Sequence, residues 1–439
     1  MNFFIHRIFH ASFAILAVSS ITEITLADGE GTPEPNLISI RLSGDDIVGP
    51  FITEALRNNP GLQAYEKRYQ AARESILSAR ALPNPKIQLT HFIEAIQTRT
   101  GPQRDVLVLQ QPIPWLGKLR GSGNIARAHS ESLWHAYSAH QFTIIETIAN
   151  RVLEIAFLDK SIVLTRENTV LLRQLEILAE ERFKSGGNLT DLLRLQVETE
   201  RFDDQIARQQ AERIGLAAKL EALLGRRISG TISEINWQSP QSLKGNSDQW
   251  LTATRNNNPK LKILRSLEQS QEARERLASL SNKPDFTVGL NYHRTGDAIN
   301  PNTADSGKDP WAIMVGLSLP IWGKSNHSIS LQASLQKEAI SAQIEEQELH
   351  LLGEVRAWIA KLDDSQKRLD RYNERLLPLA RQAKEITESS YRANQVSLLD
   401  VIDSERTLIE LETKYWQAAA DAWVARWNLA TISGGTWLD

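Results

Sequence analysis

Large apolar or aromatic residues alternate with mostly small or polar residues along two runs in the second half of the chain. The first run covers residues 286–292, and the second covers residues 311–319. Such alternation gives a β-strand one apolar face and one polar face. With their flanks the runs reach about ten residues, the length that a tilted strand needs to cross a bilayer. A weaker version of the pattern lies in the first half, so we predict two hairpins, at residues 86–114 and 285–321.

Each predicted hairpin is followed by a stretch that is poor in helix-breaking residues over an unusual length. Residues 119–182 contain no proline, and residues 325–390 contain one glycine and one proline, Gly353 and Pro378. A continuous helix of about 64 residues would be roughly 95 Å long. Because ordinary globular helices are much shorter, such a helix needs a coiled-coil partner or a repeated architecture to pack against.

Two later helical stretches, residues 191–225 and 399–432, show the heptad pattern of coiled coils. Their seam positions recur in alternating steps of three and four, and one offset of 209 residues relates the two patterns. An apolar stripe with this spacing forms the seam of a coiled coil. Thr199, Gln209 and Arg213 interrupt the first seam with polar side chains.

Short motifs recur between the two halves at nearly constant spacing. The sequence RNNP at residues 57–60 returns as NNNP at residues 256–259, which is 199 residues later. In each half the motif precedes a helical stretch, the strands, a long helix, a turn and another helix. We therefore predict two structural repeats, residues 28–230 and residues 231–439.

A tryptophan followed closely by Gly-Lys ends each predicted hairpin. Trp115 and Lys118 stand in PIPWLGK, and Trp322 and Lys324 stand in LPIWGK. Proline ends strand pairing and glycine permits a bend, so both motifs mark a passage from strand to helix. Tryptophan is enriched at membrane–water interfaces, and we expect both tryptophans there, with the lysines facing water or lipid headgroups. A plain corner with a packed tryptophan would use the same residues.

Two hairpins cannot cover their own edges or an apolar face. They could belong to a soluble sandwich, but the strand-like segments are few beside the helical ones. A closed barrel would therefore need strands from other copies of the chain.

The N-terminus has the layout of a secretory signal peptide. Arg7 and His10 precede an apolar run at residues 11–18, and Ala27 follows in a context suited to cleavage. We predict a signal peptide over residues 1–27, and a buried first helix is the alternative. No later apolar run reaches the roughly 18 residues of a membrane-spanning helix.

Composition and motifs exclude several classes of function. A net charge of −3 does not provide the positive field typical of nucleic-acid binding. The absence of cysteine excludes disulfides, thiolate metal sites and an N-terminal lipid on cysteine. The histidines are scattered, and no zinc-hydrolase, nucleophile-elbow or phosphate-loop motif occurs. We predict that the protein is not an enzyme and needs neither a cofactor nor a metal.

The chain resembles the TolC-type outer-membrane efflux channels from about residue 49 to residue 433. The resemblance rests on the duplicated plan, the two Asn-Pro motifs, the Trp-Gly-Lys corners and the tip sequence YRANQVSLLDVIDSER at residues 391–406. The motif QPIPWLGK is most similar to the corresponding sequence in outer-membrane components of heavy-metal export systems.

The resemblance implies a mainly α fold with a transmembrane β-barrel portion. Three chains would share a twelve-stranded barrel in outer-membrane lipid, and their long coiled-coil helices would form a periplasmic tunnel. The implied partners are a periplasmic adaptor and an inner-membrane pump. The expected function is the export of small solutes, including metal cations. A soluble periplasmic coiled-coil adaptor or scaffold is the competing interpretation, and the membrane-length strands disfavour it.

The tip sequence supplies the candidate gate. Asp400 and Asp403 are three residues apart, hence on one helix face, and in a trimer each would form a ring of three carboxylates. Such rings favour cations, and mutual repulsion would raise their proton affinity. Helix capping is the alternative for Asp400. The resemblance adds Tyr391 and Asp191 to the gate.

The resemblance also implies that the hairpin tips contact the adaptor, through Phe183, Gly186, Gly187 and Asn394. A simple helix-turn-helix loop predicts the same composition. The chain departs from the family pattern at Val396, where some members carry an arginine that helps to lock the closed tip.

Overall fold

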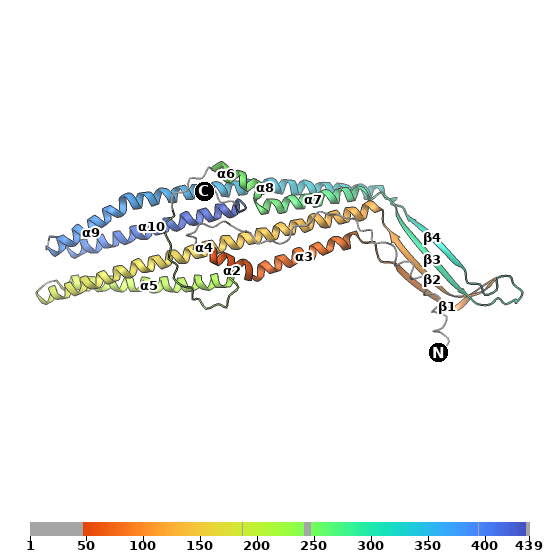
Figure 1. The fold of residues 1–439 in the computed structure, drawn as a ribbon, viewed down its shortest axis with the longest axis horizontal. Coiled ribbons are helices and arrows are strands. Elements are labelled where there is room, and N and C mark those ends of the chain that lie inside the picture. Colours follow the sequence, from red (N-terminus) through yellow and green to blue (C-terminus); the bar gives the residue numbers. More distant parts are fainter. Residues whose placement is uncertain (1–46, 187, 241–246, 394, 436–439) are drawn as a thin grey trace. The chain divides into compact units, whose positions relative to one another are not determined.

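The computed structural model describes residues 47–186, 188–240, 247–393 and 395–435, and its elements carry the labels of Figure 1. All these residues belong to the unit Leu37–Asp439. The other unit, Met1–Asn36, contains the predicted signal peptide at residues 1–27 and lies outside the described residues.

Four antiparallel strands form one sheet in the order β1-β2-β3-β4 (Figure 1). They are β1 (Lys86–Thr98), β2 (Gly101–Ile113), β3 (Asp285–Thr295) and β4 (Trp311–Ser318). The strands lie where the alternating patterns place them. The two hairpins meet because β2 pairs with β3, although the long helices of the first half separate these strands in the sequence.

One face of this sheet is apolar, and both of its outer strands have an open edge. Strand pairing aligns one row of apolar side chains across the sheet: Leu89, Leu107, Tyr292 and Trp311. On β4 the side chain of Ile313 is 80% exposed. Within the described chain, β1 and β4 each pair on one side only, so each leaves backbone donors and acceptors free for another strand.

The helices pack around α4, which has 69 residues and extends beyond the predicted range 119–182 at both ends. In chain order they are α2 (Gly49–Asn58), α3 (Pro60–Arg80), α4 (Leu116–Lys184), α5 (Leu189–Leu223), α6 (Ser247–Asn257), α7 (Pro259–Ser279), α8 (Gly323–Arg371), α9 (Leu377–Arg392) and α10 (Leu398–Ile432). Among the described residues, no helix combines the length and the hydropathy that a membrane crossing requires.

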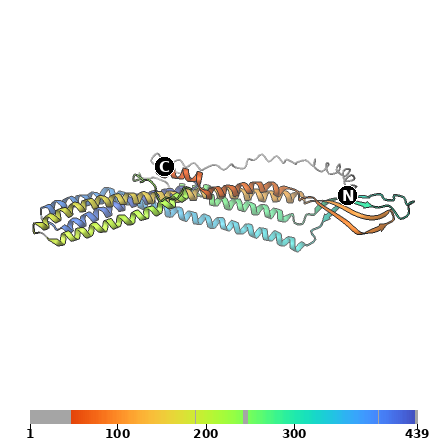
Figure 2. The same ribbon diagram turned by 90° about the horizontal axis from the view of Figure 1, so that it is seen from below.

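The helices form two rows that share α4. Near the sheet the order is α8-α7-α4-α3, and away from the sheet it is α9-α10-α4-α5 (Figures 1 and 2). The outer members of the rows are therefore α8 and α9 on one side and α3 and α5 on the other. The α4–α5 and α9–α10 hairpins end at the same end of the rows, far from the sheet (Figure 1).

The helical path expected over residues 325–390 runs from Gly323 to Arg392, but it is not α-helical throughout. A π-helical turn, η1 (Tyr372–Leu376), separates α8 from α9. Pro378 has no N–H to donate to the carbonyl of Glu374, and its ring crowds that carbonyl. The wider π turn accommodates this defect within a helical path.

Two of the apolar clusters in the described chain concern the central helix and the hairpin tips. The larger one surrounds the middle of α4 and includes Ile145, Ile148 and Val152, which are fully buried. The second one, called the tip cluster below, joins both hairpins and consists of Leu172, Ala179, Leu195, Phe202, Tyr391, Leu398, Val401 and Ile402. Leu195, Phe202 and Val401 lie on the predicted heptad seams, and Ile402 lies beside one.

Asn59 and Asn258, from the recurring Asn-Pro motifs, form similar junctions in the two halves. Each side-chain oxygen accepts hydrogen bonds from backbone N–H groups in the first turn of the following helix, α3 or α7. Each side-chain nitrogen donates to a carbonyl at the end of a long helix, at 2.9 Å to Leu223 and 2.8 Å to Ile432. The motif therefore caps one helix and fastens it to the end of another.

Candidate functional site

The turn between α4 and α5 exposes residues predicted to contact an adaptor. Phe183, in the last turn of α4, is 41% exposed. Gly186 has φ +97°, a conformation that favours glycine. Asn188 then caps α5, since its side-chain oxygen accepts a hydrogen bond from the Thr190 N–H at 3.0 Å. Gly187, predicted for the same surface, lies outside the described residues.

Asp191 lies in the first turn of α5, one turn from this exposed loop. Its backbone N–H donates to the carbonyl of Asn188 at 3.3 Å. A carboxylate at this position is favoured by the free N–H groups of the helix terminus. Asp191, predicted as a gate residue, therefore also has a carboxylate that the start of α5 stabilises.

Asp400 forms a capping box with Ser397 at the start of α10. The Ser397 N–H and hydroxyl donate to Asp400 Oδ2 at 2.8 and 2.7 Å, and the Asp400 N–H donates to Ser397 Oγ at 3.4 Å. The capping role that the sequence left open for Asp400 is confirmed. The Ser397 hydroxyl, and then its backbone N–H, lower the pKa of Asp400 within the single chain. The place of Asp400 in a ring of three carboxylates stays a prediction. Asn394, predicted for the adaptor contact, lies outside the described residues.

Tyr391 is buried in the tip cluster and contacts the other hairpin. Its side chain is held by Arg182 of α4, whose guanidinium lies 4.2 Å from the ring centroid. Arg182 Nη2 also donates to the Tyr391 carbonyl at 3.3 Å. This cation–π contact links the end of α4 to the end of α9. Val396, which stands where some family members carry arginine, packs against the same cluster.

A buried carboxylate makes a second link between the hairpins. Glu198 of α5 is only 6% exposed, and Arg406 of α10 reaches both of its oxygens, with Nε 2.8 Å from Oε1. Arg201 Nη1 adds a longer contact of 3.4 Å. The hydrogen bonds from Arg406 are the main cause of a lowered pKa at Glu198. Arg406 Nη1 also lies 3.8 Å from Asp403 Oδ1, and the Asp403 side chain is 70% exposed.

A third charged cluster lies between α9 and α10. Glu405 is nearly fully buried, and its carboxylate lies 2.8 Å from Lys384 Nζ. Burial, opposed by Lys384 and aided by the nearby Glu388, raises the pKa of Glu405. Neither buried glutamate was predicted from the sequence. Each stands beside a seam position, and that adjacency is the one signal that could have indicated them.

The two Trp-Gly-Lys corners differ in their contacts although they share a motif. Lys118 Nζ lies 2.9 Å from Asp285 Oδ1 and donates to the Lys283 carbonyl at 3.0 Å. The Trp115 N–H donates to the same carboxylate at 2.9 Å, and its ring stacks on Phe286. The first corner is therefore fastened to the start of β3.

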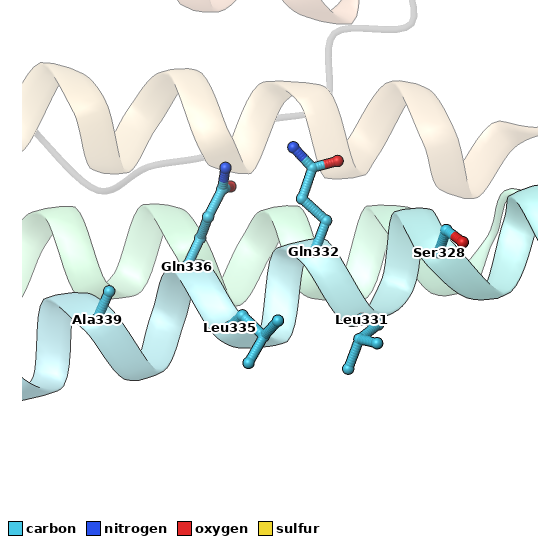
Figure 3. A pocket seen from close by; sticks show the side chains of 6 residues that line it. All are labelled: Ser328, Leu331, Gln332, Leu335, Gln336 and Ala339. Carbon is cyan, nitrogen blue, oxygen red and sulfur yellow. The ribbon is translucent and has the colours of Figure 1, made fainter.

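In the second corner, Trp322 precedes α8 and is 74% exposed, and Lys324 is exposed in the first turn. Farther along, α8 carries a shallow apolar groove. Figure 3 shows Leu331 and Leu335 pointing away from the neighbouring helices, with Ser328 and Ala339 at the ends of the groove. This face of α8 is uncovered by the described chain.

The described residues hold no group of three or more histidine, aspartate or glutamate side chains that could bind a metal ion. The geometry is instead that of a scaffold with an apolar sheet at one end and charged helical tips at the other.

The chain belongs to the outer membrane efflux protein family, whose model matches residues 51–226 and 250–435. The resemblance found in the sequence is therefore confirmed. The predictions of an efflux role in transport, of an outer-membrane location with a large periplasmic part, and of a channel rather than an enzyme agree with this family.

Solved structures share the fold over nearly the whole chain. CusC, described in terms of transmembrane channel formation, has a TM-score of 0.75 at 19% identity and covers 94% of this chain and 100% of its own. The outer membrane protein VceC from Vibrio cholerae has a TM-score of 0.74 at 19% identity, with 89% and 97% covered. The Campylobacter jejuni outer membrane channel CmeC has a TM-score of 0.73 at 14% identity, with 92% and 94% covered. A comparison with curated proteins found no match.

Proposed function

We propose that three copies of the chain form the outer-membrane channel of a tripartite efflux system. The single observation that carries this proposal is the open sheet, with an exposed apolar face and unpaired outer edges on β1 and β4. In a membrane every backbone polar group must be paired, so β4 of one copy would pair with β1 of the next until twelve strands close. The helices would continue this barrel as a periplasmic tunnel.

The helical rows support the same assembly. Helix α8 lies on the side of β4, and α3 lies on the side of β1 (Figure 1). The outer helices also differ in surface character, since α8 carries the exposed Leu331 and Leu335 whereas α3 exposes Lys67, Arg68 and Arg73. Unlike edges that meet head to tail generate a closed ring, because each copy offers one edge of each kind.

The two halves would be structural repeats, residues 28–230 and 231–439. Two findings support this division. The family model matches the chain twice, once in each half, and the capping asparagines Asn59 and Asn258 make similar junctions.

Asp400 and Asp403 would ring the narrow periplasmic end, with Asp191 and Tyr391 beside them. Carboxylates that converge on an axis favour cations, so exported metal cations are the substrate class that this gate suits among small solutes. The heavy-metal branch of the family is supported by the corner sequence QPIPWLGK. The structural similarity to CusC is consistent with this proposal but shows only the fold.

The free hairpin tips would contact a periplasmic adaptor, which would connect the channel to an inner-membrane pump. Phe183 and Gly186 support this role because they are exposed at the turn, and Gly187 and Asn394 complete the proposed surface. At the other end, Trp115, Trp322, Lys118 and Lys324 would lie at the level of the outer-membrane lipid headgroups. A soluble adaptor is not favoured, because it would have no use for an exposed apolar sheet.

Cysteine cross-linking of the purified protein tests the assembly, and the absence of native cysteine makes the test clean. Leu335→Cys on α8 is combined in turn with Ala64→Cys, Ala71→Cys or Ser78→Cys on α3. We expect at least one pair to give a covalent trimer on a denaturing gel. Leu335→Cys alone is the control, because a head-to-tail ring does not bring two copies of one edge together. Dimers from the control, with no trimer from any pair, would refute the proposal.

A further inference from the structure

The link between Glu198 and Arg406 joins two hairpins that are far apart in the sequence. Glu198 lies on α5, and Arg406 lies two turns into α10. Both carboxylate oxygens of Glu198 contact the guanidinium, which is the two-point geometry that fixes distance and orientation together. Because Glu198 is buried, its charge depends mainly on Arg406, and the longer contact with Arg201 contributes less.

Arg406 also faces the exposed carboxylate of Asp403, one turn earlier on α10. The 3.8 Å ion pair leaves Asp403 accessible while a positive charge stands beside it. One guanidinium thus connects a buried anchor on α5 to an exposed acid on α10.

We propose that Arg406 is a positioning residue that holds Asp403 at the channel tip by anchoring α10 to the buried Glu198 of α5. This proposal rests on the proposed gate and adds to it the element that sets its width. Arg406 fixes how far the α9–α10 hairpin stands from the α4–α5 hairpin. It also moderates the negative charge that Asp403 presents to a passing cation.

Two other features of the hairpins, the π turn before α9 and a second contact near the tips, are consistent with Arg406 as the anchor. The π turn η1 (Tyr372–Leu376) and Pro378 interrupt the path from α8 into α9, so the α9–α10 hairpin is joined to α8 through a weakened helical segment. Near the ends of the hairpins, Arg182 and Tyr391 provide a second contact. Separation of the hairpins requires the Glu198–Arg406 pair to break.

The test compares Arg406→Gln, Glu198→Gln and the exchanged pair Glu198→Arg with Arg406→Glu. The matched control is Arg208→Gln, because Arg208 makes an exposed ion pair with Asp204 on α5. Trimers in planar bilayers report conductance and cation selectivity. Spin labels on Leu193→Cys and Leu399→Cys report the distance between the hairpins without any need for conduction.

Both neutral variants should widen the spin-label distance distribution and raise the conductance by about twofold or more. The exchanged pair should restore the distance and the conductance, yet increase cation selectivity, because position 406 would then add a negative charge beside Asp403. A purely structural role would not produce this split between restored distance and altered selectivity.

An unchanged distance distribution in Arg406→Gln would overturn the proposal. Failure of the exchanged pair to restore the distance would also overturn it. Absence of conductance from the unmodified protein would instead remove the proposed channel function, while the spin-label distances would still decide whether Arg406 anchors the hairpin.

Discussion

Replacement of Arg213 by methionine should release the segment that connects α5 to the second half of the chain. Residues 226–240, called the connecting segment here, lack regular secondary structure and are hydrogen-bonded to α4 and α5. Arg213 of α5 forms an ion pair with Asp159 of α4 and donates to the carbonyls of Ile232 and Ser233 at 2.9 and 3.3 Å. Asp159 in turn accepts the Ile235 N–H at 3.0 Å.

The magnitude follows from the burial of the pair. The Asp159 side chain is 6% exposed and the Arg213 side chain is 17% exposed, so water cannot replace the guanidinium well. Removal of one partner from a buried ion pair costs about 3–5 kcal/mol, and partial exposure of Arg213 argues for the lower end. A local loss of about 3 kcal/mol raises the open population of the segment by about a hundredfold.

Hydrogen–deuterium exchange measured by mass spectrometry can detect this change. The amide of Ile235 should exchange about a hundredfold faster in Arg213→Met. The amides of Ser229 and Gly230 provide an internal reference, because they donate to Glu221 rather than to Asp159. They should change much less.

Arg208→Met is the matched control, since it removes an arginine from an exposed ion pair on the same helix. Exposed pairs contribute about 0–1 kcal/mol, so the exchange of Ile235 should barely change. An Ile235 amide that stays protected in Arg213→Met would refute the reasoning, because another contact would then hold the segment.

Four further outcomes follow from single contacts. Gly225→Ala should cost more than about 1 kcal/mol in thermal unfolding, because φ is +70° and a Cβ would lie 2.7 Å from the carbonyl oxygen of Asn58. Leu261→Ala should cost about 2–5 kcal/mol in the same assay, because Leu261 is fully buried. Acid should weaken the link between Glu198 and Arg406. The pKa of Glu198 is lowered in the folded protein, so the link stabilises the fold fully above the ordinary glutamate pKa near 4.5, and this stabilisation is lost as the pH falls through the lowered pKa. Spin-label distances between the hairpins at pH 7 and at acid pH would show the loss. Lys118→Gln should loosen the first corner, measured as faster proteolysis at the start of β3, whereas Lys324→Gln should have little effect because only Lys118 is fastened to Asp285.

The strands, the long helices and the seams were predictable because their signals are local. Alternation over 286–292 fixes the side-chain faces of β3, and the scarcity of proline and glycine permits helix over most of α4. The Ser397–Asp400 cap was open to prediction for the same reason, since the two residues are three apart.

The features that the sequence did not reveal depend on partners far along the chain. In the sequence, Glu198 resembles a solvent-exposed charge beside a seam position. Its partner Arg406 lies 208 residues later, so no local pattern connects the two. Lys118 and Lys324 stand in similar sequence motifs, but it is Lys118 that forms an ion pair with Asp285. Pro378 indicated a defect in a helix, but packing decided that a π turn would accommodate it.

The polar residues in the α5 seam explain how a coiled-coil contact keeps one register. A purely apolar seam permits neighbouring helices to slip by a heptad at modest cost. Here Gln209 donates to Ser161 of α4 at 2.7 Å, and Arg213 pairs with Asp159. A slip by one heptad would separate both pairs at once and leave Asp159 buried without its cation, which costs several kcal/mol. The interruptions of the seam therefore fix the alignment of α5 along α4, and through that alignment the height of Glu198 opposite Arg406.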